Sequence, residues 1–118
     1  MMSLPRSNWR LEVYLPGVIT IHVAPGDTAE HELDISLYIP SNSRVLILTT
    51  HRTVGVGTIR LYPNSHATLY MALSTSALAV LNIDNNILKY KMVTGTDEYD
   101  LNIHCILRST QIRHKDMG

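Results

Sequence analysis

Residues 87–107, with the sequence ILKYKMVTGTDEYDLNIHCIL, show the clearest periodicity in the chain. Apolar and polar side chains alternate over 88–92 and again over 99–107, and this period of two is typical of β-strands that bury one face. The polar segment 94–98 separates the two runs and contains Gly95, which suits a tight connection because glycine tolerates positive φ. The stretch therefore predicts a β-hairpin, with lysines on the polar face of its first strand and carboxylates on that of its second.

The same alternation, interrupted by proline, glycine, asparagine and aspartate, continues through the rest of the chain. Segment 34–39 is expected to be either a strand end or one helical turn. Segment 72–81 could also be read as an alanine-rich helix, but the serine and threonine in its middle favour strands. Besides the two runs above, strands are expected at 10–15, 19–23, 28–33, 45–48, 58–62, 69–73 and 77–83.

Turn signals that recur every ~8–12 residues predict an all-β protein, an antiparallel β-sandwich or jelly-roll of about eight or nine strands. A length of 118 residues fits one domain. The expected boundaries are an N-terminal arm at 1–9, a single β-sandwich domain at 10–113 and a C-terminal tail at 114–118.

Two segments are expected to form the core. The aliphatic run 45–48 predicts a strand that is covered on both faces near the centre of a sheet. Segment 101–105 predicts a second core strand, in which Cys105 is a small buried side chain. Accordingly, Ile47→Asp and Ile103→Asp are both expected to abolish folding, because each would bury an unpaired carboxylate.

Composition argues against several classes of partner. Ten basic and ten acidic side chains give a net charge of zero, so no binding to nucleic acid or to an anionic membrane is predicted. The sequence shows neither a signal peptide nor an apolar run of ~20 residues, which predicts a protein made in the cytoplasm. Zero net charge also removes a repulsion that would oppose self-association.

No catalytic, cofactor or metal site is predicted. His31 lies between Glu30 and Glu32, but in a strand it projects from the opposite face. The glycines of segment 55–57 precede a strand rather than the helix that a phosphate loop requires. No nucleophile motif is present, so the protein is not expected to be an enzyme.

Tyrosines and the N-terminal arm supply the candidate interface residues. Tyrosine-rich surfaces bind partners well because each ring buries a large area while its hydroxyl stays satisfied. The arm ends at Trp9, the chain's single tryptophan, and is free to reach a neighbour. The predicted interface residues are Leu4, Pro5, Arg6, Trp9, Tyr14, Tyr62 and Tyr70.

Two segments resemble modules of tailed-bacteriophage virion surface proteins. Segment 23–48 has a glycine turn, a strand ending in Asp34-Ile35-Ser36, an Ile39-Pro40 loop and a strongly apolar strand. Segment 88–101 is similar to the hairpin that often closes these modules.

The resemblance implies a trimeric β-sandwich knob without enzymatic activity. In this reading the partners are other copies of the chain and the major capsid protein, and the location is the virion, assembled in the host cytoplasm. The short arm favours a decoration or cement protein of the capsid. The alternative is a fibre-tip or receptor-binding module that recognises a host surface ligand.

Overall fold

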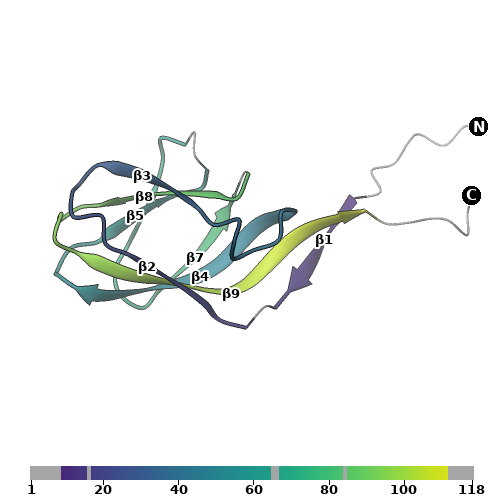
Figure 1. The fold of residues 1–118 in the computed structure, drawn as a ribbon, viewed down its shortest axis with the longest axis horizontal. Coiled ribbons are helices and arrows are strands. Elements are labelled where there is room, and N and C mark those ends of the chain that lie inside the picture. Colours follow the sequence, from purple (N-terminus) through teal and green to yellow (C-terminus); the bar gives the residue numbers. More distant parts are fainter. Residues whose placement is uncertain (1–8, 16, 65–66, 84, 112–118) are drawn as a thin grey trace, which may run out of the picture.

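In the part of the chain that the structure describes, nine β-strands form two antiparallel sheets packed as a β-sandwich (Figure 1). The structure is a computed structural model that describes residues 9–15, 17–64, 67–83 and 85–111, without the side chains of residues 9 and 111. This architecture confirms the all-β prediction. The strands are β1 (Trp9–Tyr14), β2 (Ile19–Val23), β3 (Glu30–Asp34), β4 (Ser43–Val54), β5 (Ile59–Tyr62), β6 (Met71–Leu73), β7 (Ala77–Asn82), β8 (Ile87–Met92) and β9 (Glu98–Gln111).

Sheet A has five strands in the order β1-β9-β4-β7, and β2 also pairs with β9. β4 occupies one edge of β9, while β1 and β2 pair with successive parts of the other edge. Sheet B has four strands in the order β3-β8-β5-β6. Figure 1 shows β1 and the end of β9 extending away from the body of the sandwich.

The predicted hairpin of 87–107 is wrong, although both of its strands exist. β8 lies in sheet B between β3 and β5, whereas β9 lies in sheet A between β4 and the β1/β2 edge. Segment 93–97 therefore crosses from one sheet to the other. Period-two alternation reports which face of a strand is buried, and it carries no information about which strand pairs with it. The lysines of β8 accordingly lie beside the carboxylates of β3 and not beside those of β9.

The core lies between the two sheets and consists mainly of aliphatic side chains. Leu46 and Leu48 of β4 are fully buried, as are Leu101 and Ile103 of β9. Val45 and Ile47 project from the other face of β4 and are only half-buried. β4 is thus central in its sheet, as predicted, but the described residues cover only one of its faces.

A β-bulge at His104 corrects the predicted burial of Cys105. Ile47 pairs with Cys105 and Leu48 pairs with Ile103, so His104 is an extra residue in β9. One inserted residue reverses the faces of the residues that follow it. Ile106 therefore enters the core, and Cys105 lies half-buried on the outer face.

Three local features refine the expected elements. Segment 34–39 forms a helical turn, in which the Ile39 amide donates to the Ile35 carbonyl at 3.2 Å and both side chains are buried. The helix considered for 72–81 is not formed, since β6 and β7 occupy that segment. β1 begins at Trp9, which the sequence assigned to the arm, and residues 1–8 lie outside the described part of the chain.

Candidate functional site

The outer face of sheet A carries apolar side chains in rows that cross its strands. The first row runs from Val13 of β1 to Leu107 of β9 and Val45 of β4, which are successive partners in the ladder. Residues that are opposite in a ladder project from the same face, so these side chains are neighbours. None of the three belongs to the buried core.

A second row runs parallel to the first. Cys105 of β9 pairs with Ile47 of β4, which pairs with Val80 of β7. Leu11 and Leu78 extend the same face, because each lies two residues from a member of these rows along its own strand. We call this surface the aliphatic patch: Leu11, Val13, Val45, Ile47, Leu78, Val80, Cys105 and Leu107.

The side chains of the aliphatic patch are apolar and partly or largely exposed. Leu11, Val13, Leu78 and Val80 expose 54%, 63%, 64% and 52% of their area, and the other four side chains are half-buried. None of the eight side chains has a charge or an aromatic ring. With strands ~4.8 Å apart and same-face residues ~6.8 Å apart, the eight positions of the patch cover about 260 Å². The largest apolar patch on a typical monomer covers ~300–600 Å² and often has a function, so this patch is a candidate binding surface of modest size.

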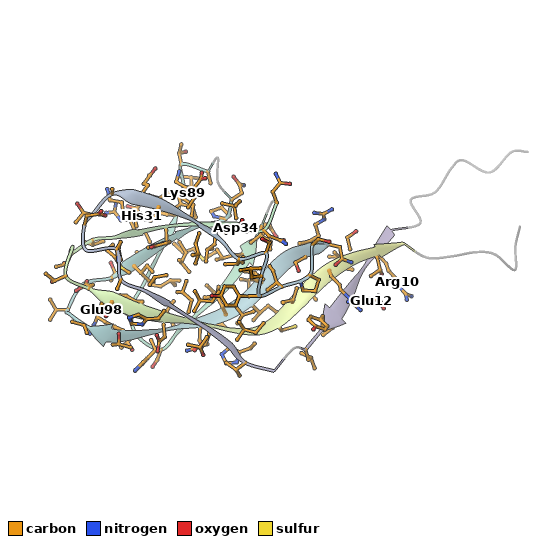
Figure 2. All side chains as sticks on the ribbon, viewed as in Figure 1. Arg10, Glu12, His31, Asp34, Lys89 and Glu98 are labelled. Atoms are coloured by element: carbon orange, nitrogen blue, oxygen red, sulfur yellow. The ribbon has the colours of Figure 1, made fainter. Side chains whose placement is uncertain are left out.

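Beyond the aliphatic patch, the same face of sheet A becomes polar. His22 of β2 lies between two carboxylates of β9, with Nδ1 2.7 Å from Asp100 Oδ1 and Nε2 2.9 Å from Glu98 Oε1. Figure 2 shows Glu98 near the end of the sandwich that is opposite Arg10 and Glu12 of β1. The hydrogen bond to Asp100, followed by that to Glu98, raises the pKa of His22 above its usual value because both favour the imidazolium form.

Two further polar pairs lie on this face. The Thr20 hydroxyl donates to Asn102 Oδ1 at 2.7 Å, and Thr49 Oγ1 lies 2.7 Å from His104 Nε2. In each pair, the polar groups of one strand form hydrogen bonds with those of the neighbouring strand. The outer face of sheet A is therefore divided into an aliphatic part and an internally hydrogen-bonded polar part.

We expect an NMR titration to place the pKa of His22 above the usual ~6.5. Because the folded-state pKa is the higher one, this contribution to stability is fully present below the unfolded-state pKa and is lost as pH rises through the folded-state pKa. Asp100→Asn should lower the pKa of His22, whereas Asp34→Asn, a change on sheet B, should leave it unaltered. An unchanged His22 titration in Asp100→Asn would contradict the assignment.

The outer face of sheet B has the opposite character. Lys89 Nζ lies 3.2 Å from Glu30 Oε1 and 4.5 Å from the centre of the Tyr62 ring, and Arg60 lies 4.3 Å from the centre of the Tyr70 ring. The hydrogen bond from Lys89 lowers the pKa of Glu30, and burial raises the pKa of Tyr62. Lys89 is thus held by a carboxylate and a ring, and Arg60 by a ring. Figure 2 shows Lys89, His31 and Asp34 in the layer that sheet B forms.

The structure brings two of the three predicted interface tyrosines together, since the ring centres of Tyr62 and Tyr70 lie 5.7 Å apart, and it places Tyr14 on the other sheet. Tyr14 is half-buried on the inner side of sheet A, where it packs against the core beneath Arg108. Tyr62 is buried in sheet B, and Tyr70 exposes 44% of its area beside it. Trp9 pairs through its backbone with Gln111. Leu4, Pro5 and Arg6 lie outside the described residues.

One end of the sandwich is held together by a buried carboxylate. Asp97, in the connection between β8 and β9, is 1% exposed and lies against the segment from Gly55 to Gly57. The Val56 amide donates to Asp97 Oδ1 at 3.1 Å, while Oδ2 has no hydrogen-bond partner among the described residues. A shallow hollow lies next to this connection, lined by Ala24, Gly26, Gly95, Thr96, Asp97 and Glu98. The arrangement fixes the loop between β4 and β5 to the connection between the sheets.

No group of three or more metal-ligating side chains converges within the described residues. The same residues include no helix that is long and apolar enough to cross a membrane. Comparison of the chain with protein-family models, curated proteins and solved structures gave no match.

The aliphatic patch was not predicted from the sequence, although the sequence held a signal for it. The run 45–48 predicts a strand covered on both faces, and segment 77–81 is similarly apolar at every position. Sheet B covers only the inner face of β4 and β7, where Leu46, Leu48 and Leu81 lie. Apolar residues on both faces of a strand in a two-layer protein are therefore a signal for an exposed apolar surface.

Proposed function

We propose that this protein is a non-enzymatic structural component of a phage virion, a homotrimeric knob that decorates the capsid shell and cements it. The observation that carries the proposal is the aliphatic patch, a sheet face that is suited to permanent contact rather than to chemistry. Such a protein needs a rigid β-core, one surface that meets its own copies and another that rests on the shell. The resemblance of segments 23–48 and 88–101 to phage surface modules supplies the virion setting.

The two outer faces differ in chemistry, which supports the proposal that one surface meets other copies and another meets the shell. The aliphatic patch has no charged side chain, and interfaces between permanent subunits are the most apolar class of interface. The outer face of sheet B is charged and polar, with Glu30, Lys89 and Arg60 held in defined positions. A face of this kind suits contact with a shell or with solvent at the virion surface.

The alternative, a fibre-tip or receptor-binding module, draws support from Tyr70. Its ring is 44% exposed, and the guanidinium of Arg60 lies 4.3 Å from the ring centre. An exposed tyrosine beside an arginine is a common anchor for a protein or glycan ligand. The aliphatic patch would then join the copies, and the face around Tyr70 would recognise the host.

Gold-labelled antibodies against the purified protein should locate it on virions by electron microscopy. Regular labelling over the capsid supports the cement proposal, whereas labelling at fibre tips favours the receptor-binding alternative. Capsids depleted of the protein should regain several degrees of thermal stability when it is added back, because a ligand that binds only the intact shell stabilises it. Virions without label, or capsids whose thermal stability does not respond, would overturn the cement proposal.

A further inference from the structure

Two cationic side chains face each other on the outer face of sheet B. Arg60 of β5 and Lys91 of β8 are directly opposite in the antiparallel ladder, so they project from the same face, and both are half-buried. Like charges in opposite positions of a sheet repel each other. The ion pairs among the described residues include Lys89 of β8 but neither Arg60 nor Lys91. An anion bound between these two cations would relieve their repulsion.

The carboxylate beside Lys91 is engaged with another cation. Glu30 of β3 is the ladder partner of Lys91, but its Oε1 lies 3.2 Å from Nζ of Lys89. On the other side of Arg60, the ladder partner is the exposed Ala72, whose side chain has no polar atom. This row of the sheet therefore leaves the two cations available to a ligand.

A chain of stacked groups holds the Arg60 guanidinium in position. Lys89 Nζ lies 4.5 Å from the centre of the Tyr62 ring, and the centres of the Tyr62 and Tyr70 rings are 5.7 Å apart. Arg60 lies 4.3 Å from the centre of the Tyr70 ring. Tyr62 is buried, whereas Tyr70 is 44% exposed at the end of the chain. A guanidinium stacked on a ring keeps the N–H groups at its edge, where they match both oxygens of a carboxylate or a phosphate.

The charges around Arg60 favour a ligand with a single negative charge. The row that contains Arg60 also contains Lys91 and Glu30, and the next row contains Lys89 and Glu32. Three cations and two carboxylates leave one positive charge in excess. A carboxylate balances that charge, whereas a phosphate monoester carries nearly two negative charges at neutral pH.

The other groups of this face suit the hydroxyls and the ring of a sugar. Glu32 has no ion pair among the described residues, and a carboxylate accepts hydrogen bonds from hydroxyls but repels further anions. An acidic peptide would bring several negative charges towards Glu30 and Glu32, while an acidic sugar brings one carboxylate and several hydroxyls. The exposed rings and side chains of Tyr70 and Leu69 supply apolar surface for the C–H groups of the sugar.

We propose that Arg60, Lys91 and Tyr70 form a binding site for an acidic sugar, a saccharide unit that carries one carboxylate. Arg60 binds the carboxylate through two parallel N–H···O bonds, Lys91 adds a positive charge beside it, and Tyr70 packs against the sugar ring. The site names a ligand class for the receptor-binding alternative, and it rests on that alternative only for its biological setting.

NMR titration of the full chain with two single-carboxylate sugars, sialyllactose and cellobiouronic acid, tests the site. At least one of them should bind with a Kd of about 1 mM or lower and shift the signals of Arg60, Tyr70 and Lys91. The methyl ester of the same sugar should bind ~10-fold more weakly or worse, because it lacks the charge. Added NaCl should weaken binding of the acid, since exposed charges are screened.

Substitutions assign the binding to these residues. Arg60→Gln and Lys91→Gln should each weaken binding of the sugar ~10-fold or more, because each removes a charge-assisted contact. Arg44→Gln is the matched control: Arg44 is exposed on β4, in the other sheet, and this variant should bind as the wild type does. Circular dichroism should show that all three variants are folded.

Several outcomes would overturn the site: no binding of either acid, equal binding of an acid and its methyl ester, or an equal loss in Arg44→Gln. Binding of inorganic phosphate or tetraglutamate as tight as that of the sugar would overturn the assignment to sugars. The outcomes are separate from those of the cement proposal. A protein that labels capsids but binds no acidic sugar overturns this site alone, and one that binds the sugar but is absent from virions overturns the proposed function alone.

Discussion

Ile103→Asp is expected to abolish folding, whereas Ile47→Asp is expected to leave the fold intact. Ile103 of β9 is fully buried between the two sheets. An unpaired carboxylate at this position costs several kcal/mol, which is comparable to the whole stability of a typical domain, ~5–15 kcal/mol. Ile47 is half-buried on the outer face of sheet A, in the aliphatic patch, so its substitution by aspartate should weaken association instead.

Urea denaturation followed by circular dichroism distinguishes the two variants. Ile47→Asp should retain a cooperative transition at the mass of a monomer, and Ile103→Asp should lack one. Because Ile103→Asp could fail to accumulate at all, Ile103→Ala provides a measurable substitute, with an expected loss of ~2–5 kcal/mol in the free energy of unfolding. A soluble and cooperatively folded Ile103→Asp variant would contradict the placement of Ile103 in the core.

Gly55→Ala is expected to be the most damaging glycine substitution in the described chain. Gly55 has a φ of +101°, a conformation that costs a residue with a side chain ~1–3 kcal/mol. A Cβ at this position would also overlap the carboxylate of Asp97, which is itself buried and held by the Val56 amide. The two effects together should lower the free energy of unfolding by ~3 kcal/mol or more.

Gly26→Ala is the matched control for this prediction. Gly26 has a φ of +75°, but a Cβ there would meet no atom within 4 Å, so only the backbone strain of ~1–3 kcal/mol should appear. Combining Gly55→Ala with Asp97→Ala removes the overlapping carboxylate, and the double variant should lose less stability than the sum of the two single variants. Equal losses for Gly55→Ala and Gly26→Ala would show that the contact with Asp97 contributes nothing.

The candidate site was less predictable than the fold. The sequence predicted that Tyr14 and Tyr62 would contact a partner. In the structure, Tyr62 is buried and Tyr14 faces inward. Leu11 and Val13 were read as part of an ordinary strand, but they project from the outer face. A period of two states that one face of β1 is apolar, and it does not state whether that face meets the chain's own core or another molecule.

The sequence by itself determined the approximate positions of the strands, because alternation and turn residues act over a few neighbouring positions. It did not determine their lengths, since β4 runs from Ser43 to Val54 where only 45–48 was expected. It also determined that Leu88 and Tyr90 of β8, and Leu101 and Ile103 of β9, are buried. Only the tertiary structure decided that β8 and β9 belong to different sheets and that β4 has one uncovered face. The tertiary structure alone also decided that β9 has a bulge at His104. Strand pairing, register and the burial of a second face all depend on contacts between residues that are far apart in the chain.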